Sequence, residues 1–273
     1  MFFMDTNKLL SNHLKKIQWV FVGLTHPGNL GAILRALKNT GCSPPILIDP
    51  GADVMINCPQ VRSRAAHAKD YVNDIEFRNL ETALGESRMV IGFTARDRDI
   101  QVPKKPFEEI LETVSENLLR WDDFKVSFVF GSEKCGLSNK ELSRCTLVCT
   151  LDVDESYPSL NISHATLLVA YSIRNTIKRI FFMKKDPATE IRDKNNLSRL
   201  MKKPARQKTL YSLERSMIFL AERVNFFNRG KRENSEMKMR RWIVNNNIEE
   251  EDARLMISFF SEIGKKFNCT EDQ

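Results

Sequence analysis

Three segments of the chain combine glycine, hydroxyl and amide side chains in a way that could bind a ligand. They read HPGNLGAILRALKNTG (26–41), FVFGSEKCGLSNKEL (128–142) and YPSLNISHATLL (157–168). Each comes after an apolar run typical of a strand and leads into a helical pattern. Ligands of open α/β sheets bind beyond the carboxyl ends of the strands, where backbone N–H groups recognise polar groups. A single such segment is more typical of a turn with a helix cap, but three of them indicate a site.

One arginine in the first segment stands apart. From Leu30 onwards, leucine and isoleucine recur at three- and four-residue spacing, which predicts a helix with one apolar stripe. Arg35 lies off that stripe, on the flank that carries Gly31 one turn earlier. Because helical side chains lean toward the N-terminus, Arg35 is expected to reach over a residue without a side chain. The alternative is an ordinary surface arginine.

The elements that would position these segments alternate between strands and helices. We expect strands at 17–24, 46–49, 88–94, 125–131 and 146–153, and a long apolar helix over 159–182. This alternation predicts an α/β fold with a mostly parallel sheet over residues 1–182. Residues 183–206 have the composition of a linker. Residues 207–273 show helical apolar stripes and are expected to form a small all-α domain.

Composition excludes several classes of protein. With 42% hydrophobic and 28% charged residues, the chain is globular, and no apolar run is long enough to span a membrane. We therefore expect a cytoplasmic protein. The six cysteines include no C-x-x-C pair and there are four histidines, so no metal site is expected. Neither a G-x-x-x-x-G-K-[ST] nor a G-x-G-x-x-G motif is present.

The positive charge is concentrated in the last third of the chain. Residues 184–273 hold 20 Lys/Arg and 14 Asp/Glu, whereas residues 1–183 hold 22 and 21, so +6 of the +7 lies in the last third. A basic domain of this kind is typical of a protein that meets a polyanion such as RNA. A solvated basic surface is the alternative.

The three segments, in this order, resemble the signatures of the SpoU group of the SPOUT superfamily. That resemblance implies an S-adenosylmethionine-dependent RNA 2′-O-methyltransferase with a C-terminal trefoil knot. We also expect a homodimer with the long helix from Ser159 in the interface, because the apolar residues of this helix run nearly all round it. With IGFTARDR (91–98) and the helical tail, the chain is most similar to the tRNA (cytidine/uridine-2′-O)-methyltransferases of the TrmJ type, which act in the anticodon loop. An rRNA methyltransferase of the same family and a catalytically silent RNA-binding homologue are the alternatives.

The resemblance also implies roles for particular residues. The expected catalytic residues are Arg35, Ser159 and Asn161. The expected cofactor-binding residues are Phe93, Thr94, Ala95, Gly131, Leu151, Pro158, Ser159 and Leu160. The expected RNA-binding residues are Asn29, Arg35, Arg62, Arg64, Arg96 and Glu133. Ser132 and Pro158 depart from the commonest family pattern, and we expect Ser132 to alter an RNA contact.

A guanidinium stays protonated in proteins, which decides how Arg35 is interpreted. We interpret it as a donor that orients the ribose hydroxyl or a neighbouring phosphate and stabilises the developing alkoxide, and not as a base. On this interpretation Gly28 and Asn29 shape a tight turn. Gly31 would leave room for RNA beneath the Arg35 side chain.

Overall fold

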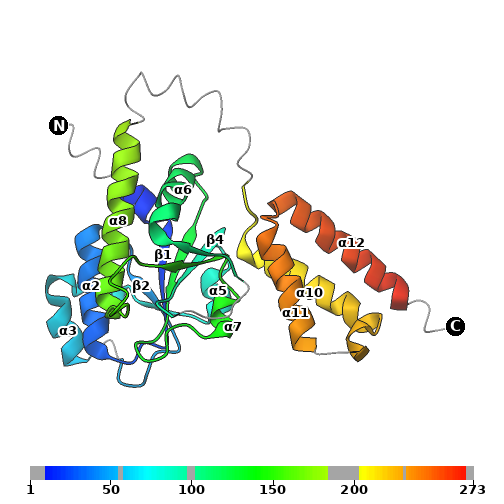
Figure 1. Ribbon diagram of the computed structural model, residues 1–273, viewed down its shortest axis with the longest axis horizontal. Coiled ribbons are helices and arrows are strands. Elements are labelled where there is room, and N and C mark those ends of the chain that lie inside the picture. Colours follow the sequence, from blue (N-terminus) through cyan, green and yellow to red (C-terminus); the bar gives the residue numbers. More distant parts are fainter. Residues whose placement is uncertain (1–9, 55–57, 97–101, 184–202, 230–231, 269–273) are drawn as a thin grey trace.

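The computed structural model describes residues 10–54, 58–96, 102–183, 203–229 and 232–268. Residues 16–183 contain a seven-stranded sheet in which every pair of neighbouring strands is parallel. Its order is β3-β2-β1-β6-β4-β7-β5. Figure 1 shows the sheet, with β1, β2 and β4 labelled. The strands are β1 (Ile17–Val22), β2 (Pro45–Ile48), β3 (Glu76–Phe77), β4 (Met89–Phe93), β5 (Lys104–Pro106), β6 (Val126–Phe130) and β7 (Leu147–Thr150). The predicted mostly parallel α/β sheet is confirmed.

All five predicted strands are present. Four of them are two to four residues shorter than expected, and β2 is shifted by one residue. The sequence did not indicate β3 and β5, which are the two edge strands. Their residues are exposed, and they contain two and three residues respectively. Such short, exposed strands carry no apolar run from which they could be recognised.

Helices cover both faces of the sheet. They are α2 (Pro27–Thr40), α3 (Pro59–Ala65), α4 (Asp70–Asn73), α5 (Leu80–Leu84), α6 (Phe107–Arg120), α7 (Asn139–Leu142) and α8 (Ile162–Met183), with a 3-10 turn, η1 (Ala66–Ala68). One face packs against α2, α6 and α8, and the other against α5 and α7. Because β1 alternates between these faces, Trp19 and Phe21 lie in one cluster and Val20 and Val22 in the other.

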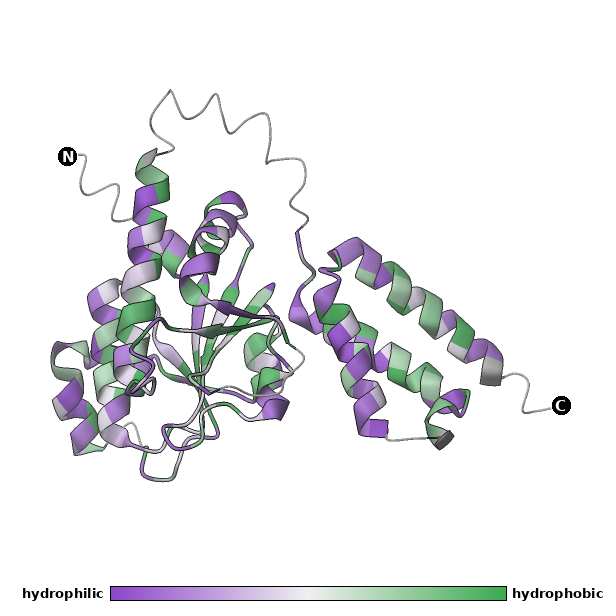
Figure 2. Cartoon of the chain, in the orientation of Figure 1, coloured by the Kyte–Doolittle hydropathy of each residue, from purple (hydrophilic) through white to green (hydrophobic). Residues whose placement is uncertain are grey.

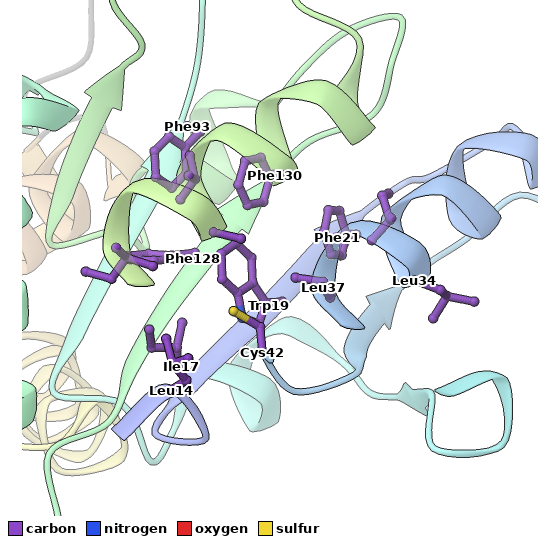
Figure 3. Packing of buried hydrophobic residues seen from close by; sticks show 14 of the residues in the cluster. Leu14, Ile17, Trp19, Phe21, Leu34, Leu37, Cys42, Phe93, Phe128 and Phe130 are labelled. Atoms are coloured by element: carbon purple, nitrogen blue, oxygen red, sulfur yellow. The ribbon is translucent and has the colours of Figure 1, made fainter. Parts of the chain in front are cut away.

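An aromatic layer forms the centre of the larger cluster (Figure 3). The rings of Phe93 and Phe130 stack at 4.7 Å, and Trp19 meets Phe128 edge to face at 5.3 Å. Aromatic pairs of this geometry stabilise a core beyond the burial of their area. These rings lie on β1, β4 and β6, and therefore fix the three central strands next to one another.

The C-terminal residues are helical and have a hydrophobic cluster of their own. The helices are α10 (Gln207–Arg223), α11 (Arg232–Asn245) and α12 (Glu250–Asn268), with a 3-10 turn, η2 (Phe226–Arg229). Leu210 and Leu213 of α10 pack against Ile243 and Ala253 of the other two helices. Figure 2 shows apolar and polar residues alternating along these helices, as in amphipathic helices.

These helices contact the sheet at the amino ends of its strands. Backbone N–H groups of Gln207 and Lys208 donate to the carbonyls of Ser87 and Gly85, just before β4. Glu214, almost fully buried, pairs with Arg144 before β7 and with Arg240 of α11. Arg144 and the segment 85–88 both precede strands, so α10–α12 lie at the opposite end of the sheet from the carboxyl ends of the strands.

The predicted linker lies mostly outside the described residues. Its last four residues, 203–206, are described, and they are packed. Ala205 is fully buried and Arg88 donates to the carbonyl of Pro204 at 2.6 Å. No helix of the described residues combines the length and apolar character that crossing a bilayer requires.

Candidate functional site

The three polar segments meet at one edge of the sheet. They follow β1, β6 and β7, and the sheet order places β6 between β1 and β4, with β7 beside β4. Because the strands are parallel, their carboxyl ends lie at the same edge. The site predicted from the three segments therefore has a single location.

Glu133 ties the second segment to the first. Its Oε2 accepts from the backbone N–H and the hydroxyl of Thr25, both at 3.0 Å. Its Oε1 accepts from the backbone N–H of His26 at 3.0 Å and from Asn29 Nδ2 at 2.9 Å. Four donors around one carboxylate hold the loop after β6 against the start of α2.

Asn29 passes this connection on to the third segment. Its Oδ1 accepts from Asn161 Nδ2 at 3.1 Å. Asn161 Oδ1 in turn accepts from the backbone N–H and the hydroxyl of Ser163, at 2.9 and 2.7 Å, and so caps α8. One chain of side chains, Glu133–Asn29–Asn161, therefore joins all three segments.

The direction of this chain follows from the carboxylate. An ionised carboxylate only accepts hydrogen bonds, so Asn29 must turn its NH₂ toward Glu133 and its oxygen toward Asn161. That leaves the Asn161 oxygen facing the first turn of α8, whose N–H groups need acceptors. Each amide can satisfy its neighbours in one orientation only.

The ionisation of Glu133 is favoured by the same contacts. Partial burial raises the pKa of Glu133, but the hydrogen bonds from Asn29 and from the backbone of Thr25 and His26 outweigh it. The net result is a pKa below the usual 4.5. Glu133 is therefore charged at neutral pH, and both its oxygens accept hydrogen bonds from within the protein.

These contacts give two residues a positioning role. Both oxygens of Glu133 and both polar atoms of Asn161 form hydrogen bonds that hold the segments together. The RNA-binding role expected of Glu133 and the catalytic role expected of Asn161 stay predictions. Ser159 is exposed, and no described residue hydrogen-bonds to it, so its predicted role is unaffected.

Arg35 lies on the exposed side of α2, as its off-stripe position predicted. No hydrogen bond or ion pair joins its guanidinium to another described residue. The stripe itself, including Leu30, Ile33 and Leu34, is fully buried. Arg35 is therefore available to a ligand on this side of α2.

The predictions for the glycines around Arg35 were wrong. Helix α2 begins at Pro27, so Gly28 and Asn29 are helical and form no separate tight turn; His26 is the N-cap and accepts from the Gly28 N–H at 3.1 Å. Gly31 is buried. A Cβ at Gly31 would lie 2.5 Å from the Val61 carbonyl oxygen, so α3 occupies the space we assigned to RNA.

The residues predicted to bind the cofactor lie at the same edge, with different environments. The Phe93 ring is part of the aromatic core, so only its backbone can face a ligand. Thr94 follows it and donates its N–H to the Cys149 carbonyl. Gly131 is required by its own loop, because a Cβ there would lie 2.1 Å from the carbonyl carbon of Gly136.

Two of the predicted residues after β7 have backbone N–H groups without a described acceptor. Leu151 and Leu160 are half-buried, and no described residue accepts a hydrogen bond from either backbone N–H. Pro158 lies in the same loop and is exposed.

The remaining predicted residues lie on α3 and on the loops after β4 and β6. Arg62 and Arg64 are exposed on α3. The guanidinium of Arg96 donates to the Lys134 carbonyl at 2.7 Å, which links the loop after β4 to the loop after β6. Ser132 accepts from the Cys135 N–H at 3.2 Å, so it shapes the turn, and the RNA contact expected of it stays a prediction.

Sequence reasoning missed Thr25 as a site residue. His26 opens the first predicted segment, but its backbone contact with Glu133 was not expected. Both residues lie just before Pro27, where α2 begins. The contact between α2 and α3 carried no such local signal.

Comparison with known proteins identifies the family. Residues 16–171 match the family model described as SpoU rRNA Methylase family, and the chain belongs to this family. The chain is 34% identical over 161 residues to the tRNA (cytidine/uridine/adenosine-2′-O-)-methyltransferase TrmJ of Pseudomonas aeruginosa. It is 32% identical over 163 residues to the tRNA (cytidine/uridine-2′-O-)-methyltransferase TrmJ of Citrobacter koseri.

These alignments cover 59% of this chain and 61% and 64% of the two relatives. The chain therefore matches less than two thirds of the length of either relative. Among solved structures, TrmJ from Z. mobilis superposes with a TM-score of 0.72 at 19% identity, covering 90% of this chain and 98% of that one. At this identity the superposition shows similarity of fold alone, and this similarity covers most of the chain.

Proposed function

We propose that the chain is an S-adenosylmethionine-dependent tRNA 2′-O-methyltransferase that acts on a cytidine or uridine of the anticodon loop. The observation that carries the proposal is the Glu133–Asn29–Asn161 chain, which joins the three family segments, the first of which carries the exposed Arg35 on α2. The names of the TrmJ relatives support tRNA as the substrate. The trefoil knot stays a prediction from the resemblance.

The residues at this edge fit the proposed cofactor. The free N–H groups of Leu151 and Leu160 match the acceptor atoms of an adenine ring, and their apolar side chains match its faces. The backbone of residues 93–95 and 158–160 would complete the pocket. When bound, S-adenosylmethionine supplies an electrophilic methyl group on a sulfonium.

Arg35 would act on the ribose. Methyl transfer needs the 2′-oxygen in line with the methyl carbon, and it develops negative charge on that oxygen as its proton leaves to water. Arg35 has donors but no lone pair to accept the proton, so it orients the hydroxyl and stabilises the charge. Preorganised donors of this kind contribute roughly 2.7–4 kcal/mol to the transition state.

We also propose a homodimer with α8 in the interface. Leu167, Leu168 and Tyr171 are 41%, 47% and 60% exposed, and they share one face of this helix. A second copy of the chain would bury that face. Light scattering is expected to give a dimer, and Leu168→Asp is expected to give a monomer; a monomeric wild-type protein at micromolar concentration would contradict the proposal.

The helices after residue 203 are proposed to hold RNA, on the basis of the positive charge of this third of the chain. Several of their cations are already paired, among them Lys208 with Glu86 and Arg215 with Glu81. Lys238 and Lys266 are exposed, and neither forms a hydrogen bond or ion pair with a described residue, although the charge of Lys266 helps to lower the pKa of Glu262. Replacing both by alanine should flatten the salt dependence of tRNA binding, by about one unit of log–log slope for each lost phosphate contact.

Two measurements test the proposed function. Calorimetry should detect binding of S-adenosylmethionine, and labelled S-adenosylmethionine should transfer its methyl group to tRNA transcripts and not to rRNA transcripts. Labelled rRNA would support the rRNA alternative. An absence of cofactor binding would leave the silent RNA-binding homologue.

A further inference from the structure

Helix α3 lies so close to α2 at Gly31 that no amino acid with a Cβ atom would fit at this position. A Cβ at Gly31 would lie 2.5 Å from the Val61 carbonyl oxygen, 2.6 Å from Arg64 Cβ and 3.0 Å from the Ala65 nitrogen. These distances are shorter than van der Waals contact. The start of the Arg64 side chain therefore stands where a side chain of residue 31 would begin.

This approach places Arg64 beside Arg35. Helical residues four apart have Cβ atoms about 5–6 Å from each other, so the Cβ atoms of Arg35 and Arg64 are at most about 9 Å apart. The Arg35 side chain leans toward the N-terminus of α2, over the turn that contains Gly31. Two arginine side chains can easily bring their guanidinium groups together across that distance.

Neither guanidinium has an acidic partner among the described residues. Both side chains are exposed, and neither forms a hydrogen bond or ion pair with a described residue. Lys38, one turn further along α2, shows the contrast: its Nζ lies 2.5 Å from Asp70 Oδ1. Within the described part of the chain, the neighbouring cation is thus neutralised and these two arginines have no counter-charge.

We propose that Arg35 and Arg64 together bind one phosphodiester group of the RNA, next to the ribose that is methylated. This inference rests on the proposed function and deepens it. The 2′-hydroxyl of a ribose is adjacent to its own 3′-phosphate, so a group that reaches the hydroxyl lies near that phosphate. Two planar guanidinium forks bind phosphate oxygens with two hydrogen bonds each.

The two arginines have different parts in this arrangement. Arg35 contacts the reacting hydroxyl as well as the phosphate, whereas Arg64 acts as a positioning residue through the phosphate. Gly31 is required because any side chain there would push α3, and Arg64 with it, away from Arg35. The requirement for glycine at this position thus has an explanation that does not involve open space for RNA.

The test compares Arg64→Ala and Arg64→Lys with wild type and with Lys15→Ala, an exposed cation elsewhere on the chain. A tRNA transcript is the probe, and its affinity is measured by filter binding at several salt concentrations. Hydrogen bonds to charged groups contribute enough that Arg64→Ala should weaken tRNA binding roughly ten- to hundredfold. Its salt slope should fall by about one unit.

Other readouts separate positioning from a structural role. For Arg64→Ala, the melting temperature and cofactor affinity should equal those of wild type, and KM for tRNA should rise more than kcat falls. Arg64→Lys should restore the salt slope and recover little of the affinity, because an ammonium lacks the planar fork. Lys15→Ala should bind tRNA as wild type does.

Two outcomes would overturn the inference, and they can be told apart. If wild type methylates tRNA and Arg64→Ala binds tRNA with wild-type affinity and slope, Arg64 is solvated charge and the proposed function survives. If wild type neither binds nor methylates tRNA, the proposed function fails and the inference fails with it.

Discussion

Removing the Glu133 carboxylate should loosen all three segments of the site at once. In Glu133→Ala the donors of Thr25, His26 and Asn29 lose four hydrogen bonds of 2.9–3.0 Å. At about 0.5–1.5 kcal/mol each, these bonds contribute about 2–6 kcal/mol. Water can reach most of these donors, so the lower end applies, about 2–3 kcal/mol. That corresponds to a fall of roughly 5–10 °C in melting temperature.

Glu133→Gln should cost less, because the Thr25 hydroxyl can reverse and accept from the new amide. Only the Thr25 N–H then loses its acceptor, at about 1 kcal/mol. Methyl transfer should fall by roughly a hundredfold in Glu133→Ala, since displacing a reacting group by 1 Å can cost that much. The carboxylate has a lowered pKa, so it stabilises the fold above pH 4.5 and that contribution is lost as pH falls below it. The Gln variant should lack this acid dependence.

The assay is thermal unfolding from pH 7 to pH 3, together with methyl transfer at pH 7. Glu116→Ala is the control, because Glu116 lies in a helix and forms no hydrogen bond or ion pair with a described residue. This substitution should change the free energy of unfolding by no more than about 0.5 kcal/mol. If Glu133→Ala has the melting temperature and the methyl-transfer activity of wild type, the carboxylate does not hold the segments. The hydrogen bonds through Asn29 to Asn161 would then not be what positions them.

Two further predictions concern the packing around the site and the attachment of the C-terminal helices. Gly31→Ala should displace α3, cost about 1–3 kcal/mol in thermal unfolding and raise KM for tRNA, with cofactor affinity unchanged; a wild-type KM would show that the position of α3 is irrelevant to RNA. Lys203, followed by Arg88, lowers the pKa of Asp123 to about 2, from the usual 3.8. Because a lowered pKa favours the folded state above the unfolded value, this contribution should be complete above pH 3.8 and lost as pH falls to about 2. Asp123→Asn should reduce the change in melting temperature between pH 3.8 and about pH 2. An unchanged acid dependence would exclude these ion pairs as its cause.

The sequence predicted the parts of the fold that depend on local patterns. The five central strands are buried apolar runs, which their hydrophobic patterns predicted. The common edge of the three segments followed from parallel strands. Helix α8 begins at Ile162, three residues later than expected, because the Asn161 side chain caps it and leaves Pro158 and Ser159 outside.

Contacts between distant segments could not be predicted in this way. Gly31 was interpreted from its own helix, but its reason is the backbone of α3, some thirty residues further along. The same holds for Glu133, whose four donors lie more than a hundred residues earlier. Hydrogen bonds between loops depend on their distance and direction in space, and no periodicity in the sequence records either.

One measurement tests the central claim most directly: mapping the methylated nucleotide on tRNA after incubation with S-adenosylmethionine and either wild type or Arg35→Ala. A 2′-O-methyl group blocks alkaline cleavage at its own phosphodiester, so it leaves a gap in the hydrolysis ladder. Wild type should give a gap at a cytidine or uridine of the anticodon loop. Arg35→Ala should fold and bind cofactor normally, yet the gap should form at least about a hundredfold more slowly. Methyl label without a gap would place the methyl group on a base, and an Arg35→Ala protein of near wild-type rate would show that another group acts on the hydroxyl; either result would contradict the account.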